Sequence, residues 1–146
     1  HFGFKPETDV LYSSRRKQNF NLPECRDLVR VEFSKDSQKA FGAKPSAGAR
    51  SQYMVLSKFA QYDCIVHFHC PMKPGANVAV RPQRMFECGS HQCGENTAAG
   101  MMEYGNGIAA VMLDKHGPNI VFSRDANPAE VIKFISENFD LTKRTR

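Results

Sequence analysis

Residues 64–69 read Cys-Ile-Val-His-Phe-His, a short apolar segment that carries two histidines at alternate positions. Its β-branched and aromatic residues favour a buried strand, because such side chains pack well on a pleated surface. Side chains two positions apart on a strand point to the same face of the sheet. His67 and His69 are therefore expected to present both imidazoles to one point.

A third histidine follows a second apolar segment. Residues 108–113 predict another strand, and residues 116–119, His-Gly-Pro-Asn, predict a tight turn into a strand at 120–122. The turn can bring His116 to the same sheet edge as the histidine pair. Three histidine nitrogens that leave one coordination position open are typical of a catalytic zinc site. The alternative is that all three are ordinary strand and turn residues, since His-x-His is common by chance.

Strands and helices alternate through the second half of the chain. Apolar residues at helical spacing predict a helix from Ser51, as its N-cap, to about residue 62. Residues 70–94 predict a long loop, residues 95–104 a helix, and Asn127 the N-cap of a last helix that runs to about residue 139. This alternation indicates a layered α/β domain rather than a helical bundle or a β-sandwich.

The first third of the chain carries weaker signals. Residues 10–12 predict a short edge strand, residues 28–33 alternate as in a half-buried strand, and residues 34–48 are turn-like. A chain of 146 residues, 41% of them hydrophobic, has the size of one globular domain. We therefore expect a single domain over residues 1–146.

Composition limits the classes of function. No run reaches the roughly 18 consecutive apolar residues of a membrane span, and the first residues lack the layout of a signal peptide. Five cysteines without a dense framework suit a reducing compartment, so we expect a soluble, cytoplasmic protein with free thiols. The net charge of +5 suits an anionic partner. The one dense basic run, Arg15-Arg16-Lys17, lacks interleaved aromatics, so we expect a solvated loop there and no nucleic-acid partner.

The order of these segments resembles the class II aldolase/adducin family. The resemblance covers roughly residues 22–140 and rests on Lys44-Pro45-Ser46, on the His-x-His strand and on residues 109–117, which end in His-Gly. It implies a three-layer α/β/α fold with a central mixed, largely antiparallel sheet, and a homotetramer. It also implies that zinc, or another divalent metal, is held by the three histidines, His67, His69 and His116.

The resemblance implies a sugar-phosphate lyase that cleaves a ketose phosphate through a metal-stabilised enediolate. Epimerases, decarboxylases and dehydratases use the same intermediate, and the adducin branch keeps the fold as a non-catalytic binding or structural module, so these remain alternatives. Ser46 would bind the substrate phosphate, with Lys44 adding positive charge. The plainer interpretation of Ser46 is a turn serine beside a proline.

The chain departs from the family in two respects. Gly48 stands where the family carries its acid/base glutamate, and a glycine cannot transfer the substrate proton. A replacement base would have to come from the loop after the histidine strand, where we prefer Glu87 to Glu95 as the catalytic residue; a solvated loop residue is the alternative for Glu87. The family's N-terminal part, with its phosphate loop, is also expected to be lacking.

Four further residues could bind a metal. Cys88, His91 and Cys93 lie close together in sequence and could form part of a second site with Cys70, but their spacing does not match paired Cys-x-x-Cys motifs. Loop packing is the preferred interpretation.

Tyr104 is a possible proton donor, although packing at a helix end is its plainer role.

Overall fold

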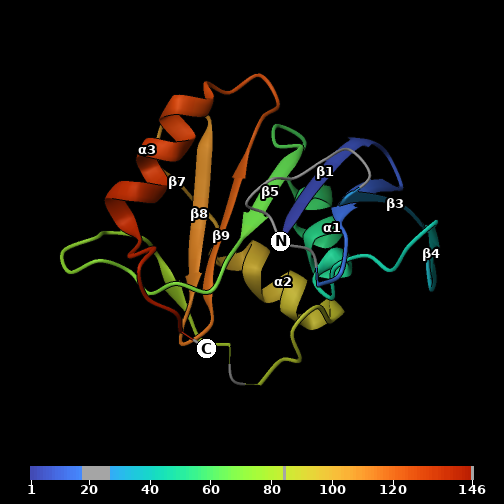
Figure 1. Cartoon of the computed structure of the whole chain (residues 1–146), viewed down its shortest axis with the longest axis horizontal. Coiled ribbons are helices and arrows are strands. Elements are labelled where there is room, and N and C mark those ends of the chain that lie inside the picture. Colours follow the sequence, from blue (N-terminus) through green and yellow to red (C-terminus); the bar gives the residue numbers. More distant parts are fainter. Residues whose placement is uncertain (18–26, 84, 146) are drawn as a thin grey trace.

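The computed structural model describes residues 1–17, 27–83 and 85–145. Within these ranges the chain forms an α/β domain with nine strands in one sheet and three helices (Figure 1). The strands are β1 (Phe2–Glu7), β2 (Val10–Ser14), β3 (Leu28–Phe33), β4 (Gln38–Phe41), β5 (Cys64–His67), β6 (Val80–Arg81), β7 (Met102–Glu103), β8 (Ile108–Leu113) and β9 (Gly117–Phe122). The helices are α1 (Ala49–Lys58), α2 (His91–Gly100) and α3 (Pro128–Asn138).

The sheet is mixed and largely antiparallel, as expected. Its strand order is β4-β3-β2-β1-β5-β9-β8-β6, with β7 also paired to β8. In the described part of the chain, the pairing of β6 with β8 is parallel and the other pairings are antiparallel. The strands β5, β8 and β9, which carry or flank the three histidines, are therefore adjacent.

Alternate residues of the central strands belong to two separate clusters of buried side chains. Ala109 of β8 joins the cluster that includes Val55 of α1, whereas the next residue, Ala110, joins the cluster that includes Val131 of α3. Successive side chains of a strand point to opposite faces. Helices α1 and α3 therefore pack against different faces of the sheet, and Figure 1 shows α2 beside α1.

The expectation of an edge strand at residues 10–12 is wrong. These residues belong to β2, which pairs with β1 on one side and with β3 on the other. Both edges of the strand are therefore paired, and Val10 and Leu11 are buried. The sequence pattern missed β1, and it also missed β4 within the segment expected to be turn-like; the rest of the expected N-terminal loop falls partly outside the described residues.

The helices follow their capping signals unevenly. Helix α3 begins as predicted, because the Asn127 side chain accepts a hydrogen bond from the Ala129 N–H at 3.0 Å. Helix α2 begins at His91, four residues before the expected start, because Ser90 accepts a hydrogen bond from the Cys93 N–H at 3.1 Å. Among the described helices, none is long and apolar enough to span a membrane.

Helix α1 begins three residues earlier than expected, after Gly48 rather than after Ser51. The hydroxyl of Ser51 does not cap the helix; it donates to the Gly48 carbonyl at 2.9 Å. The side chain that supports the helix start is instead that of Ser46, whose Oγ accepts a hydrogen bond from the Gly48 N–H at 3.1 Å. The segment from Ser46 to Gly48 is thereby fixed next to the histidines.

Candidate metal centre

The three histidines lie together where β5 ends beside the turn that joins β8 to β9. Strand β5 ends at His67, two residues before the expected end, so His69 follows the strand rather than belonging to it. His67 is opposite Asn119 in the β5–β9 ladder, and His116 lies in the turn just before β9. One potential ligand nitrogen from each of the three imidazoles lies within 4.8 Å of the others.

His67 is held in one tautomer. Its Nδ1 lies 2.8 Å from the carbonyl oxygen of Pro118, which can only accept, so Nδ1 carries the hydrogen and Nε2 exposes its lone pair. Burial, and after it the positive charge of His116, lowers the pKa of His67 from 6.5 to about 3. The imidazole is therefore neutral at neutral pH, which is the form that binds a metal.

The separation of His67 and His69 matches that of two ligands of one ion. Their Nε2 atoms are 3.1 Å apart. Two nitrogens bound to a tetrahedral zinc at about 2.0–2.1 Å would lie roughly 3.3 Å from each other. Only a small shift of one ring would let both nitrogens bind the same ion.

Thr145 ties two of the histidines together from outside the sheet. Its N–H donates to the His69 carbonyl at 3.1 Å, and its hydroxyl donates to the His116 carbonyl at 2.5 Å. This residue therefore limits how far the two histidine-bearing segments can move apart.

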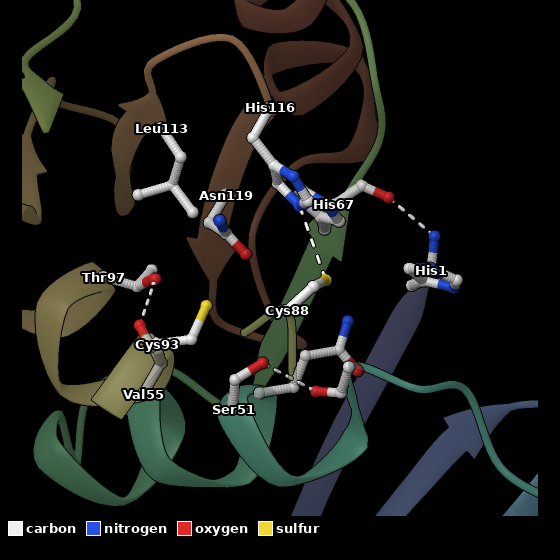
Figure 2. A pocket seen from close by; sticks show the side chains of 12 residues that line it. His1, Ser51, Val55, His67, Cys88, Cys93, Thr97, Leu113, His116 and Asn119 are labelled. Atoms are coloured by element: carbon white, nitrogen blue, oxygen red, sulfur yellow. Dashed lines mark hydrogen bonds between the residues drawn. The ribbon is translucent and has the colours of Figure 1, made fainter. Parts of the chain in front are cut away.

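A pocket of about 320 Å³, including the part open to solvent, adjoins the histidines (Figure 2). It is bounded by α1, α2 and the ends of the strands. Its lining residues are His1, Gly48, Ser51, Gln52, Val55, His67, Cys88, Cys93, Thr97, Leu113, His116 and Asn119. Two of the three histidines, His67 and His116, thus face this pocket.

The predicted acid/base position lies in the wall of this pocket. A Cβ atom built on Gly48 would have the Ser46 hydroxyl as its nearest neighbour at 3.7 Å, which is an ordinary van der Waals contact. The backbone of Gly48, with φ −81° and ψ 0°, is also open to residues that have a side chain. The missing side chain at this position therefore leaves space rather than relieving a clash.

Three other residues predicted for the active site, Ser46, Lys44 and Glu87, do not line this pocket. Ser46 is buried and shapes the start of α1. Lys44 is exposed and lines, with Arg15, Arg16 and Lys17, an open hollow of about 800 Å³. Glu87 is exposed on the loop before α2 and is not among the described residues that line the histidine pocket.

The expected alternatives can also be placed. In the described ranges the three histidines form the one group of three or more potential metal ligands, so the second site considered for the cysteines is not assembled. Cys93 packs with its sulfur 3.3 Å from Gln83 Nε2, and His91 is exposed near Glu95. The hydroxyl of Tyr104 accepts from the Ala79 N–H at 2.6 Å, and its ring packs on α3, as a packing role requires.

Gln52 was missed by the sequence analysis. It is 2% exposed, lines the pocket, and neither atom of its carboxamide has a hydrogen-bond partner. It lies on the same face of α1 as Val55 and Leu56, three and four residues later, and both of those are buried. A polar residue on an otherwise apolar helix face was the signal that could have found it.

Comparison with known proteins gives a match in fold and no match in sequence. No family model matches the chain, and no curated protein sequence matches it significantly. Among solved structures, it resembles an L-fuculose 1-phosphate aldolase with a TM-score of 0.66 and 16% sequence identity, over 93% of this chain and 69% of that protein. At this identity the likeness shows a shared fold.

Proposed function

We propose that the chain binds a divalent metal, zinc in preference to others, through His67, His69 and His116, and that it is a lyase of the class II aldolase type. The observation that carries the proposal is the cluster of three imidazoles, two of them at ligand separation, beside a pocket. The fold shared with L-fuculose 1-phosphate aldolase supports the class of reaction. A three-layer α/β/α arrangement and a homotetramer are part of this proposal.

The chemistry divides between the metal and the chain. A divalent ion bound by these histidines supplies a Lewis acid that stabilises negative charge on substrate oxygens. The Pro118 carbonyl holds His67 in the orientation and tautomer that ligation needs. Gln52 offers a buried, unpaired carboxamide that would bind a substrate hydroxyl or carbonyl group, since burial makes an unsatisfied amide costly.

A phosphorylated sugar fits the charges near the start of α1. The hollow lined by Lys44 and the run Arg15–Lys17 gathers four cationic side chains, which suits a phosphate. The three residues of the run are exposed to solvent, as the sequence suggested. Lys44 and Gly48 are four residues apart, so their Cα atoms are separated by at most about 14 Å. One substrate could thus reach both the cationic hollow and the histidine pocket, with Ser46 between them.

A lyase of this type also needs an acid/base group that transfers the substrate proton. Glu87 precedes Cys88, which lines the pocket, so a modest rearrangement of the loop would bring its carboxylate to the rim. We propose Glu87 for this role. Gly48 favours a second candidate function, a metal-binding but non-catalytic module, because it removes the side chain that the family uses to move the proton.

Metal analysis combined with a cleavage assay tests the proposal. We expect stoichiometric zinc after exposure to Zn²⁺, and release of an aldehyde from a ketose 1-phosphate, measured with a coupled dehydrogenase. Replacement of Glu87 by glutamine should reduce the rate and leave the metal content unchanged. Zinc without any cleavage would favour the non-catalytic module, and a protein that binds no divalent metal would refute both.

A further inference from the structure

We propose that Cys88 is a fourth ligand of the metal centre, so that the ion is held by three imidazole nitrogens and one thiolate. This inference rests on the proposed metal binding by the histidines, and it does not depend on which reaction the protein catalyses. The sequence alone suggested loop packing for Cys88, whereas the structure places its sulfur beside His116, one of the three histidines.

The sulfur of Cys88 lies next to one of the three imidazoles. Cys88 Sγ lies 3.5 Å from His116 Nε2, and Figure 2 shows the thiol directed toward His116 and His67. For a tetrahedral zinc with a Zn–S distance of about 2.3 Å and a Zn–N distance of about 2.0–2.1 Å, a sulfur and a nitrogen ligand lie roughly 3.5 Å apart. The observed separation therefore needs little adjustment for both atoms to bind one ion.

Close packing of backbone on backbone brings the thiol there. Gly89 has φ +83°, and a Cβ atom on it would lie 2.0 Å from the Ala47 carbonyl oxygen and 3.5 Å from the Gly48 Cα. Only glycine permits this approach, so the loop before α2 rests directly on the start of α1.

The charge balance of the site favours a thiolate. Three neutral imidazoles leave the full double charge on a divalent ion, and among the described residues that line the pocket there is no aspartate or glutamate. Cys88 can supply one negative charge: its S–H proton leaves to solvent as the sulfur–metal bond forms, and no oxidant or reductant is needed. Its exposed loop could later release the sulfur and open the position to a substrate oxygen.

Two of the other described cysteines, Cys64 and Cys93, are less suited. Cys93 is buried and packs against Gln83. Cys64 is buried too, and burial raises the pKa of its thiol to about 12. Both provide matched controls, since each carries the same chemical group without the same relation to the histidines.

Cobalt substitution tests the proposal. We would load the metal-free protein with Co²⁺ and record its absorption, because a thiolate ligand adds a sulfur-to-cobalt charge-transfer band in the near ultraviolet that histidine ligands do not give. The wild type should show this band, Cys88→Ser should lose it and keep the visible cobalt bands, and Cys93→Ser should retain both. In competition with a chelator, Cys88→Ser should bind Zn²⁺ at least about tenfold more weakly, since even indirect partners of a metal contribute roughly that much.

The outcomes separate this inference from the proposed function. Visible cobalt bands without the charge-transfer band, or a band that survives in Cys88→Ser, would overturn Cys88 ligation and leave the histidine site intact. A wild type that binds neither Co²⁺ nor Zn²⁺ would overturn both. Alkylation gives a second readout in the unmodified chain: Zn²⁺ should slow the reaction of iodoacetamide with Cys88, and an unchanged rate in zinc-loaded protein would contradict ligation.

Discussion

The strand ends that carry the histidines and the loops that face them are built in different ways. His67 lies in the β5–β9 ladder, is 6% exposed, and has its ring fixed by Pro118. The loop that carries Glu87 and Cys88 is exposed and approaches the histidines through the contact of Gly89 with α1. In the proposed metal centre, the strand ends would therefore position the histidine ligands, whereas the loops would supply the groups that act beside the metal.

The largest expected effect comes from the sheet side of this comparison. Replacing His67 by alanine removes one of three nitrogens, and we expect Zn²⁺ affinity to fall by more than roughly 100-fold, because even outer partners of a metal contribute 10–100-fold. Titration calorimetry measures this loss. His91→Ala is the control, because that histidine is exposed on α2. The Zn²⁺ affinity of this variant should stay at the wild-type value. Equal losses in both variants would contradict the assignment.

A change on the loop side should alter turnover without altering metal content. Gly48→Glu places a carboxylate at the pocket wall, where a Cβ atom makes only ordinary contacts, and a positioned acid/base group contributes roughly 10²–10⁴-fold to a rate. We expect faster ketose phosphate cleavage than in the wild type, with Gly48→Gln as the uncharged control. If the glutamate variant cleaves the substrate no faster than the glutamine variant, proton transfer at this position does not limit the rate of cleavage.

The pKa of His67 makes the stability of the metal-free protein depend on pH. Its folded-state pKa is about 3 and its ordinary value is 6.5, so the unfolded chain binds more protons between these values. The contribution of His67 to the free energy of unfolding is therefore fully present above pH 6.5 and is lost as the pH falls toward 3. At pH 5 the free energy of unfolding is lower by about 2 kcal/mol. Urea unfolding at pH 7 and pH 5 measures it, and His67→Gln should remove this part of the dependence. A wild type and a variant with the same pH dependence would count against a buried neutral His67.

The smallest expected effect concerns Gln52. Its buried carboxamide has no partner, so Gln52→Leu should raise the unfolding free energy of the metal-free protein by about 1 kcal/mol while it weakens substrate binding. Chemical denaturation and the KM of the cleavage assay report the two effects separately. Gln61→Leu, at an exposed position, is the control. A loss of stability in Gln52→Leu would mean that the amide is satisfied in solution and is structural.

The sequence predicted the parts of the molecule that local signals determine. The strand Ile108–Leu113 and the helix capped by Asn127 follow from apolar patterning and capping chemistry within a few residues of each element. The meeting of the histidines was also expected, because a His-x-His segment and a following His-Gly turn can share a sheet edge.

Two features that could not be predicted from the sequence depend on contacts between distant parts of the chain. The interior position of β2 depends on its pairing with β1 and β3. The approach of Cys88 to His116 depends on the contact of Gly89 with Ala47, more than forty residues earlier in the chain. Neither relation leaves a periodic trace in the sequence, so the spacing of Cys88 suggested no link to the histidines.

The most direct test of the account is the zinc content of the purified protein. After exposure to Zn²⁺ and removal of loosely bound ions, mass spectrometry should find one zinc per chain in the wild type and in His91→Ala, and none in His67→Ala. A wild type without bound zinc, or a His67→Ala variant that retains it, would contradict the claim that these histidines form a metal centre.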